Sequence, residues 1–516
     1  MIESVGANVG AMRRQLRGLP AVLVTVVVVA ALGGCGGKAA KEATISPPPP
    51  AASAAAFEYA ATLRDRIKAD ALMNHLKNLQ GIANAHGGNR ALGTPGYDAS
   101  VEYVANALRD KGFDVQTPEF EVRLAFAEDP QLTVNGADVA AKPLEFTIGT
   151  PEGGVTGPLV PAPVDDSPGC TPSDYDGLPV QGALVLVDRG TCQFSQKQAV
   201  AAGRGAVAVI IANNEDGEEM GGTLGEDTNA KIPVVSVTKD SGERLRAAPA
   251  DTTLKLKAGV RVEKTRNVIA QTKTGSTDDV VMVGAHLDSV PEGPGINDNG
   301  SGTAAVLETA LQMGPSPQVR NAVRFGFWGA EERGLKGSNN YVGSLDADEL
   351  KNIALYLNFD MLGSPNPGYF TYDGDQSLAP SPRDPTPRVP EGSAGIERNF
   401  VAYLKDQGET AQDTAFDGRS DYDGFTMAGI PSGGLFSGAE EKMTREQADL
   451  WHGTADEPFD PNYHKKTDTL DHIDLRALGI NGAGVGYVVG IYAQDQRGRN
   501  GVPIRDDRTR HVLSDS

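Results

Sequence analysis

Apolar runs alternate with a helical segment in the second half of the chain, and this pattern constrains the fold most. Val280–Val283 and Val323–Trp328 have the length of buried strands, and Gly302–Met313 between them has the length and composition of a helix. Ile353–Phe359 is a third strand-like run. Strands joined by crossover helices pair in parallel, and such a sheet needs helices on both faces. The sequence therefore predicts an α/β fold with a mostly parallel central sheet flanked by helices.

The chain of 516 residues is longer than a single hydrophobic core usually organises, so we expect more than one domain. Residues 149–260 have shorter segments: strands at Gly182–Asp188, Ala206–Ile211 and Ile232–Val237, and a helix at Lys197–Ala202. We expect this stretch to be a small β-rich α/β domain inserted into the larger one. The larger domain then consists of residues 57–148 and 261–496, followed by a polar tail at 497–516.

The first residues have the pattern of an export signal. Three arginines precede the apolar run Ala21–Leu32, which is too short to span a bilayer comfortably but fits a secretory signal peptide. The run ends in Leu32-Gly33-Gly34-Cys35, which resembles the bacterial lipoprotein signal. We expect residues 1–34 to be removed and Cys35 to be lipidated. An ordinary signal peptide with a chance cysteine is the alternative.

Residues 35–56 include four consecutive prolines among Ala, Ser and Lys, a composition that cannot build a core. We expect a tether that holds the folded protein near the outer face of the cell membrane, to which the lipid on Cys35 anchors it. The net charge of −21 disfavours binding to nucleic acid. In an exported protein the remaining pair, Cys170 and Cys192, is a plausible disulfide, and two free buried thiols are the alternative.

Side chains that carry chemistry follow each of the strand-like runs. His286 and Asp288 come directly after the first run, Glu331 and Glu332 after the second, and Asp360 after the third. The carboxyl ends of parallel strands lie along one edge of a sheet, where binding and catalytic sites usually form. We expect Asp298, in a glycine-rich loop, and His464, before the last helical segment, to join them.

Each of these features alone has a structural explanation. The loop Gly295–Gly302 lacks the P-loop lysine and the GxGxxG order, so it does not indicate nucleotide binding. Ser420 and Asp421 would suit a serine hydrolase, but no Gly-x-Ser-x-Gly elbow contains that serine. Together, however, the histidines and carboxylates form a ligand set for two bridged metal ions, whose charge would relieve the repulsion between the carboxylates.

The motifs themselves resemble peptidase family M28, the co-catalytic zinc aminopeptidases, including secreted streptomycete and mycobacterial lipoprotein members. The matching motifs are Ala285-His286-Leu287-Asp288-Ser289, Gly295-Ile296-Asn297-Asp298-Asn299-Gly300-Ser301-Gly302, Trp328-Gly329-Ala330-Glu331-Glu332, Asn358-Phe359-Asp360-Met361 and Tyr463-His464. The inserted stretch is similar to the protease-associated (PA) domain through Val187-Asp188-Arg189-Gly190-Thr191-Cys192 and Ile232-Pro233-Val234-Val235-Ser236. The resemblance implies a zinc-exopeptidase-like fold with an inserted PA domain.

The resemblance also implies a role for each site residue. Asp298 would bridge two Zn²⁺ ions, with His286 and Asp360 completing one metal site and Glu332 and His464 the other. The implied catalytic residues are Glu331 as general base, Tyr463 as a hydrogen-bond donor to the oxyanion, and Asp288 as the carboxylate that orients His286. Arg419 and Phe436 would line the substrate pocket.

The expected function is that of a membrane-tethered extracytoplasmic aminopeptidase, which removes N-terminal residues from peptides with a free amino group. We expect a monomer. Imidazole and carboxylate ligands also suit Co²⁺ and Mn²⁺, and no motif supports a calcium site. Three alternatives remain: a non-catalytic peptide-binding or receptor-like lipoprotein on the same fold, a carboxypeptidase, and a glutaminyl cyclase. A non-catalytic relative should lack ligands or the base, and none is missing here.

Overall fold

The computed structural model describes residues 54–217, 220–378 and 389–513. Cys35, the expected signal peptide and most of the expected tether lie outside the described residues. Within the described part of the chain, no helix has the length and apolar character needed to cross a membrane.

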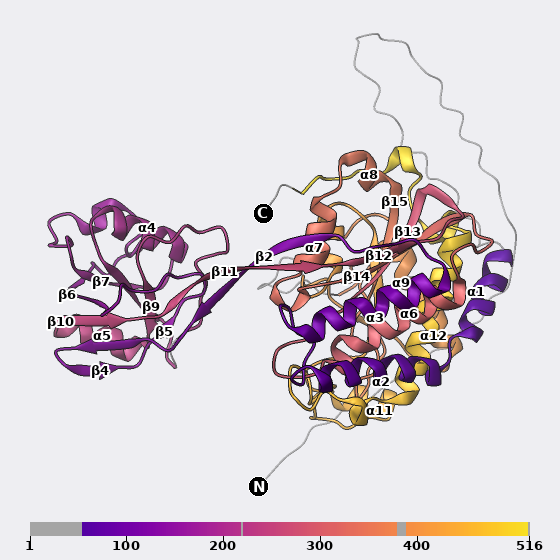
Figure 1. Cartoon of the computed structure of the whole chain (residues 1–516), viewed down its shortest axis with the longest axis horizontal. Coiled ribbons are helices and arrows are strands. Elements are labelled where there is room, and N and C mark those ends of the chain that lie inside the picture. Colours follow the sequence, from indigo (N-terminus) through magenta and orange to yellow (C-terminus); the bar gives the residue numbers. More distant parts are fainter. Residues whose placement is uncertain (1–53, 218–219, 379–388, 514–516) are drawn as a thin grey trace, which may run out of the picture. The chain divides into compact units, whose positions relative to one another are not determined.

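A mixed sheet of eight strands forms the centre of the larger domain (Figure 1). In spatial order its strands are β1 (Val115–Gln116), β12 (Val268–Gln271), β14 (Asn321–Trp328), β13 (Ser276–His286), β15 (Ile353–Phe359), β18 (Ser432–Phe436), β16 (Phe370–Tyr372) and β17 (Gln412–Thr414). The four central strands β14, β13, β15 and β18 pair in parallel. Antiparallel pairs occur towards both edges, where β12 pairs with β14 and β16 with β18. The expected parallel centre is confirmed.

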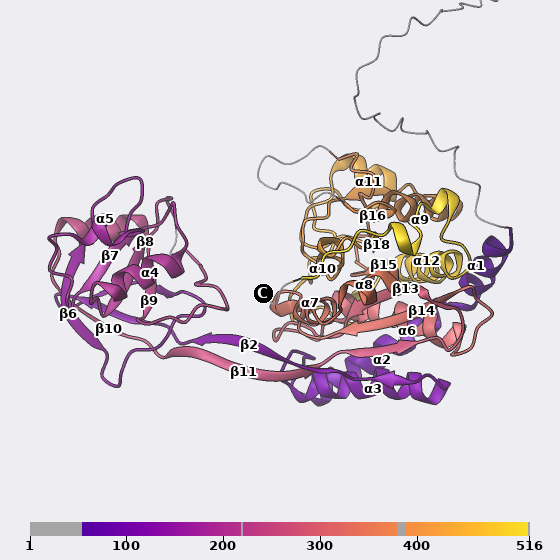
Figure 2. The same ribbon diagram turned by 90° about the horizontal axis from the view of Figure 1, so that it is seen from above.

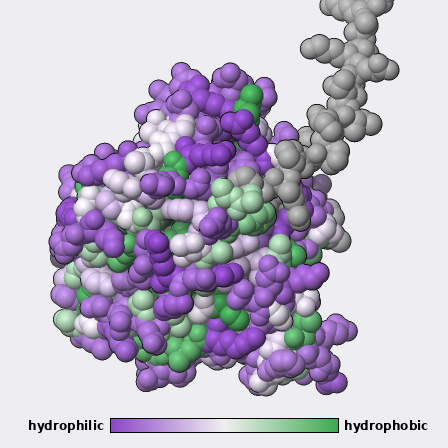
Figure 3. All heavy atoms as spheres, turned by 90° about the vertical axis from the view of Figure 1, so that its right-hand side faces the viewer, coloured by the Kyte–Doolittle hydropathy of each residue, from purple (hydrophilic) through white to green (hydrophobic). Residues whose placement is uncertain are grey.

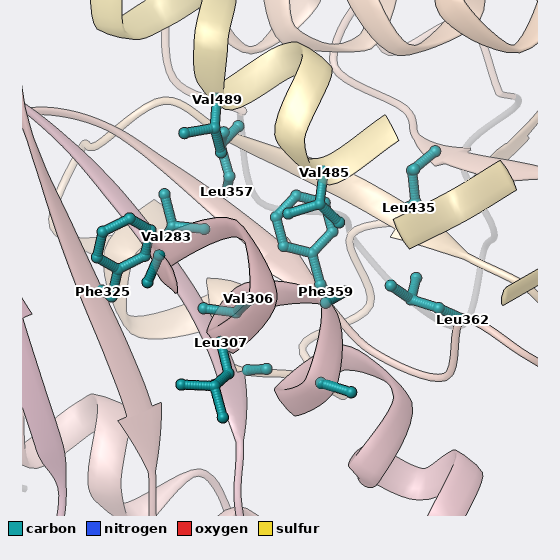
Figure 4. Packing of buried hydrophobic residues seen from close by; sticks show 14 of the residues in the cluster. Val283, Val306, Leu307, Phe325, Leu357, Phe359, Leu362, Leu435, Val485 and Val489 are labelled. Atoms are coloured by element: carbon teal, nitrogen blue, oxygen red, sulfur yellow. The ribbon is translucent and has the colours of Figure 1, made fainter. Parts of the chain in front are cut away.

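Alternating side chains of β13 divide the core between the two faces of this sheet. Val281 and Val283 belong to one buried cluster, and Met282 belongs to another. The first cluster includes residues of α1 (Ala54–Arg66), α2 (Ala69–Ala85), α3 (Pro95–Lys111), α6 (Gly302–Met313), α9 (Ser393–Asp406), α11 (Arg445–Trp451) and α12 (Leu475–Gln494). Figure 4 shows part of this cluster, with side chains from β13, β14, β15, α6 and α12.

The second cluster is richer in aromatic rings. It contains residues of α7 (Lys336–Gly343), α8 (Ala347–Asn352) and α10 (Tyr422–Met427). The rings of Tyr356 and Phe425 stack with centroids 3.8 Å apart, and Trp328 donates a hydrogen bond to the Tyr356 hydroxyl at 2.9 Å. Both faces of the sheet are therefore covered, so polar groups gather where the strands end.

Local sequence signals explain where α3 begins and ends. Thr94 accepts a hydrogen bond from the Tyr97 amide, and Pro95 occupies the first turn, where its missing N–H costs nothing. Gly112, with φ +100°, ends the helix in the left-handed conformation that glycine adopts most easily. The turn before α3 carries Arg90, which is wholly buried.

The inserted domain contains its own eight-stranded sheet, shown from two directions in Figures 1 and 2. Its order is β4 (Ala137–Val139), β3 (Gln131–Val134), β10 (Asp251–Lys255), β6 (Val155–Pro161), β7 (Leu184–Asp188), β8 (Ala208–Ala212), β9 (Val234–Val237) and β5 (Lys142–Pro143). Helices α4 (Phe194–Gly203) and α5 (Lys239–Ala247) pack on it. A disulfide joins Cys170 and Cys192.

The structure shifts the expected start of this insert. Strands β3, β4 and β5 precede residue 149, yet they pair within the insert's sheet. The chain enters through β2 (Glu119–Ala127) and leaves through β11 (Ala258–Arg266), which pair with each other as an antiparallel ribbon. The sequence of residues 131–143 does not show that they belong to the insert, because the strands with which they pair lie far along the chain.

The segment after α12 differs from the expected polar tail. Arg508 is 3% exposed, and it donates hydrogen bonds to the carbonyls of Asp278, Lys351 and Pro503. Up to Leu513 this segment therefore packs on the body. On the side of the molecule shown in Figure 3, the surface is largely hydrophilic, with apolar residues in small separate patches.

Candidate metal centre

His286 is the last residue of β13 and is almost wholly buried. Its Nδ1 lies 3.1 Å from the backbone carbonyl of Asp288. Its Nε2 lies 3.2 Å from Asp298 Oδ1, 3.4 Å from Asp360 Oδ1 and 3.8 Å from Glu331 Oε2. The Asp288 carbonyl can only accept a hydrogen bond, so Nδ1 carries a proton. In the neutral imidazole the lone pair of Nε2 then faces these carboxylates, where a metal ion could bind.

The carboxylate of Asp298 lies between two imidazoles. Its Oδ1 faces His286, and its Oδ2 is 3.2 Å from Nε2 of His464. His464 Nε2 is also 3.1 Å from Oε2 of Glu332. Two groups of potential ligands therefore share Asp298: one contains His286 and Asp360, and the other contains His464 and Glu332.

Glu331 and Glu332 lie in a short turn directly after β14. Asp288 holds this turn, because its two carboxylate oxygens accept the amides of Glu331 at 3.1 Å and Glu332 at 3.3 Å. The same carboxylate is 3.7 Å from His286 Nδ1, which is longer than a hydrogen bond. Asp288 thus hydrogen-bonds His286 through its backbone carbonyl, and its carboxylate, which we expected to orient the imidazole, lies within ion-pair distance of the same ring.

Sequence reasoning missed Ser420. Its hydroxyl donates to Asp360 Oδ2 at 2.7 Å and accepts a hydrogen bond from Asn358 at 2.8 Å. Asp360 is thereby held by one oxygen, and its other oxygen is free to face His286. From the sequence we considered Ser420 only as a nucleophile, and rejected it. Nothing in its local motif indicates a hydrogen-bond partner 60 residues away.

The site strongly favours positive charge. Burial by itself would lower the pKa of His286, but Glu331, Asp360 and the other nearby carboxylates raise it well above its usual range. In the same way His464 reaches a pKa of about 10, against the effect of burial, through Asp298 and Glu332. Burial raises the pKa of Glu331 well above its ordinary value and that of Glu332 to about 7. Such a cluster is stabilised by cations.

Two orphaned oxygens support a metal site here. Oδ1 of Asp360 and Oε1 of Glu332 are buried and have no hydrogen-bond partner. Candidate ligand sets are His286 with Glu331 and Asp360, and His286 with Asp298 and Glu332. Imidazole and carboxylate are donors that zinc accepts, so the residues present fit zinc. A third acidic group, formed by Asp373, Asp375 and Glu397, lies elsewhere and contains no histidine.

A pocket of about 400 Å³ opens onto these ligands. Its lining includes Tyr463, Arg419 and Phe436, so the structure brings these predicted residues to the site. Arg419 is held by Glu440 at 2.8 Å and Glu441 at 3.3 Å, and it lies 3.4 Å from the Tyr463 hydroxyl. Phe370 and Phe459 line the pocket beside Phe436.

Comparison with known proteins identifies the family. The chain is 70% identical to the "Probable lipoprotein aminopeptidase LpqL" of Mycobacterium tuberculosis over 459 residues, 89% of this chain and 92% of that protein. Residues 267–489 match the description "Peptidase family M28". The chain belongs to peptidase family M28. Residues 155–245 of this M28 peptidase match the PA domain. Our assignment to this family and to a metallo-aminopeptidase is confirmed.

Other relatives of this M28 peptidase are also named aminopeptidases. It is 42% identical to an "Aminopeptidase" of Pseudomonas aeruginosa, covering 82% of this chain and 80% of the relative. The aminopeptidase structure from Aneurinibacillus sp. strain AM-1 aligns with a TM-score of 0.65 at 27% identity, over 86% of this chain and 98% of that one. A zinc aminopeptidase from Bacillus subtilis aligns with a TM-score of 0.56 at 27% identity, over 85% and 98%.

Proposed function

We propose that this enzyme removes N-terminal residues from peptides by means of two zinc ions bridged by Asp298, with Glu331 as general base. One observation carries the proposal: the two oxygens of Asp298 each lie 3.2 Å from a different histidine. A carboxylate in that position can bind one ion through each oxygen. The zinc aminopeptidase from Bacillus subtilis, similar over 85% of this chain, supports zinc as the metal.

His286 and Asp360 would complete one zinc site, and Glu332 and His464 the other. When bound, zinc ions supply Lewis-acid polarisation of the scissile carbonyl and lower the pKa of water. Ser420 would keep Asp360 in its orientation through the 2.7 Å hydrogen bond. Asp288 would keep the Glu331–Glu332 turn in place by accepting both of its amides.

Glu331 would accept the proton of the attacking water and pass it to the departing amine. Its side chain is about nine-tenths buried and lies in the pocket lining beside His286. Burial raises its pKa, which makes the carboxylate a stronger base. Nearby divalent cations favour the ionised form, so that the carboxylate is free to accept a proton.

Tyr463 would donate a hydrogen bond to the oxyanion that forms on the scissile carbonyl. Burial raises the pKa of its phenol, which keeps the proton on the hydroxyl. The Arg419 guanidinium at 3.4 Å would add positive charge beside that hydroxyl.

The pocket favours an apolar N-terminal side chain. Phe370, Phe436 and Phe459 line it together, and Phe370 packs against both of the other rings. The carboxylates at its inner end would attract the cationic amino group of a peptide. "Leucine aminopeptidase 2" of Arthroderma otae is 40% identical over 85% of this chain, which agrees with an apolar preference.

A panel of aminoacyl chromogenic amides tests the proposal. We expect cleavage of leucyl and phenylalanyl amides, no cleavage after acetylation of the amino group, and loss of activity with a zinc chelator. Cleavage of substrates with only a free carboxylate would favour a carboxypeptidase. Peptide binding without turnover would favour the receptor-like alternative.

Membrane tethering is a separate part of the proposal. It rests on the Leu32-Gly33-Gly34-Cys35 motif and on the name of the 70% identical relative, a probable lipoprotein aminopeptidase. Cys35→Ser should move the enzyme from the membrane fraction to the soluble fraction, whereas Cys192→Ser should not. Continued membrane association of Cys35→Ser would contradict lipidation at this residue.

A further inference from the structure

Arg90 is a charged side chain with no exposed surface. Its guanidinium donates to three backbone carbonyls: Nε to Pro294 at 2.9 Å, Nη2 to Gly295 at 2.6 Å, and Nη1 to Leu287. Buried arginines normally pair with carboxylates, but the hydrogen bonds of the Arg90 guanidinium go to backbone carbonyls. The Arg90 guanidinium therefore holds the backbone of one loop in place.

That loop, Leu287–Gly295, connects His286 to the segment that carries Asp298. The backbone of Arg90 also joins it, because the Arg90 amide donates to the Ser289 hydroxyl at 2.9 Å. The loop ends at Gly295, which has φ +60°. A Cβ there would lie 2.3 Å from the Asp298 carbonyl and 3.2 Å from Arg90 Nη2, so the loop and the guanidinium pack without spare room.

Asp468 holds the next part of the same segment. Its carboxylate accepts the amides of Asn297 at 2.7 Å and Asp298 at 3.0 Å, and its carbonyl accepts the Ile296 amide at 3.3 Å. Asp468 is 3% exposed. It lies four residues after His464, so the same loop carries a candidate zinc ligand and the group that holds the bridging ligand.

These contacts converge on Asp298 from distant parts of the chain. Arg90 binds the carbonyls before Asp298, and Asp468 binds the amide of Asp298 itself. A bridging carboxylate has to present both oxygens at once, so a small rotation of its backbone would draw one oxygen away from its ion. Outer residues that orient metal ligands contribute strongly to metal affinity for this reason.

Charge supports the same arrangement. Burial lowers the pKa of Arg90 to about 10, yet Asp288, Asp468, Asp298 and Glu332 all act to keep it charged. The guanidinium thus stays cationic beside the acidic site. A side chain without donors at this position would leave the carbonyls of Leu287 and Pro294 without these hydrogen bonds, and Gly295 would keep only the bond from the Gly300 amide.

We propose that Arg90 and Asp468 are paired positioning residues, which hold the backbone before and at Asp298 so that its carboxylate faces both zinc sites. This inference rests on the proposed two-zinc function. Neither residue touches the pocket, and we assign them no direct part in the reaction.

The test compares Arg90→Lys and Asp468→Asn with the wild type and with Arg508→Lys in the full chain. Arg508 is the control, since it is also buried and donates to three backbone carbonyls, but it pairs with Asp279 as well and belongs to the C-terminal segment. The readouts are zinc stoichiometry and affinity by competition with a chromogenic chelator, the visible spectrum of the cobalt-substituted protein, kcat and KM, and thermal unfolding.

We expect Arg90→Lys and Asp468→Asn to bind at least one zinc ion about 10- to 100-fold more weakly than wild type. At saturating zinc, kcat should fall more than KM changes, and the cobalt spectrum should differ from wild type. Arg508→Lys should keep wild-type zinc affinity and spectrum, even where its unfolding temperature falls by a similar amount.

Wild-type zinc affinity and spectrum in Arg90→Lys and Asp468→Asn would overturn the inference. Failure of both to fold, while Arg508→Lys folds, would also overturn it, because their role would then be general stability. If only Arg90→Lys fails to fold, Asp468→Asn decides, since it keeps the size of the side chain. A wild-type protein that binds fewer than two zinc ions would instead contradict the proposed function.

Discussion

The ring of Tyr463 stacks on the imidazole of His464, with ring centroids 3.8 Å apart and an interplanar angle of 25°. The two neighbours therefore occupy their positions together, one as a candidate ligand and the other as a candidate donor. Loss of the hydroxyl alone should leave the stack intact. Loss of the ring should disturb His464 as well.

Tyr463→Phe should lower kcat about 10- to 1,000-fold and leave the zinc content unchanged, because it removes only the oxyanion donor. Tyr463→Ala should also weaken zinc binding, because His464 loses its stacking partner. Steady-state kinetics with a leucyl amide and metal analysis of both variants measure this difference. Wild-type kcat in Tyr463→Phe would remove the hydroxyl from the reaction.

Glu331→Gln should lower kcat about 100- to 10,000-fold, the usual range for loss of a general base. Its zinc affinity should stay close to wild type, since Glu331 is not among the ligands that we propose. Glu332→Gln is the matched comparison one residue away, and it should lose affinity for zinc. Equal zinc loss in both variants would mean that Glu331 is a ligand.

Gly295→Ala should destabilise the protein by about 1–3 kcal/mol, because the new Cβ meets the Asp298 carbonyl and φ is +60°. Zinc affinity should fall with it, since Asp298 has to move. Gly112→Ala is the control: it has φ +100°, but its nearest neighbour would be 3.6 Å away. Chemical unfolding should show a loss of stability in Gly112→Ala, and chelator competition should show that its zinc affinity is unchanged.

Glu397 predicts a pH dependence of stability away from the metal centre. It is 7% exposed, and burial raises its pKa to about 7. The hydrogen bond from the Asp375 amide opposes this shift, whereas the nearby carboxylates of Asp375, Asp413 and Asp373 add to it. The folded state thus holds the proton more tightly than the unfolded chain. The stability contributed by the protonated form is present at low pH and is lost as the pH rises from about 4.3 through 7.

Glu397→Gln should therefore be more stable than wild type at pH 8, by about 1–2 kcal/mol, and similar to it at pH 4. The glutamine oxygen can still accept the Asp375 amide, which is 2.9 Å from Glu397 in the wild type. Unfolding by urea at both pH values, without added calcium, measures the difference, with exposed Glu446→Gln as control. A variant less stable than wild type at pH 8 would show that the carboxylate is ionised and paired.

Elements with strong local signals could be predicted from the sequence. Gly302–Met313 and Ile353–Phe359 have the predicted bounds, because composition and neighbouring glycines or polar residues delimit them. His286, Glu332 and Asp360 were found because each stands at the end of a strand of one sheet, whereas Asp298 and His464 were found through their motifs. The order of the motifs along the chain was enough to find these ligands, without any distance between their atoms.

Features that depend on distant partners could not be predicted. Strands β3 and β5 are short, and only their pairing with β10 and β9 places them in the inserted domain. Ser420, Arg90 and Asp468 have ordinary local sequences, and their importance comes from contacts with residues far along the chain.

The contacts by which Arg90 and Asp468 hold the backbone at Asp298 also determine when the enzyme can become active. A chain still emerging during synthesis has no complete site until residue 468 has been made. Partly made or C-terminally truncated forms should therefore be inert. The enzyme would then leave other newly made chains uncleaved until it has folded as a whole.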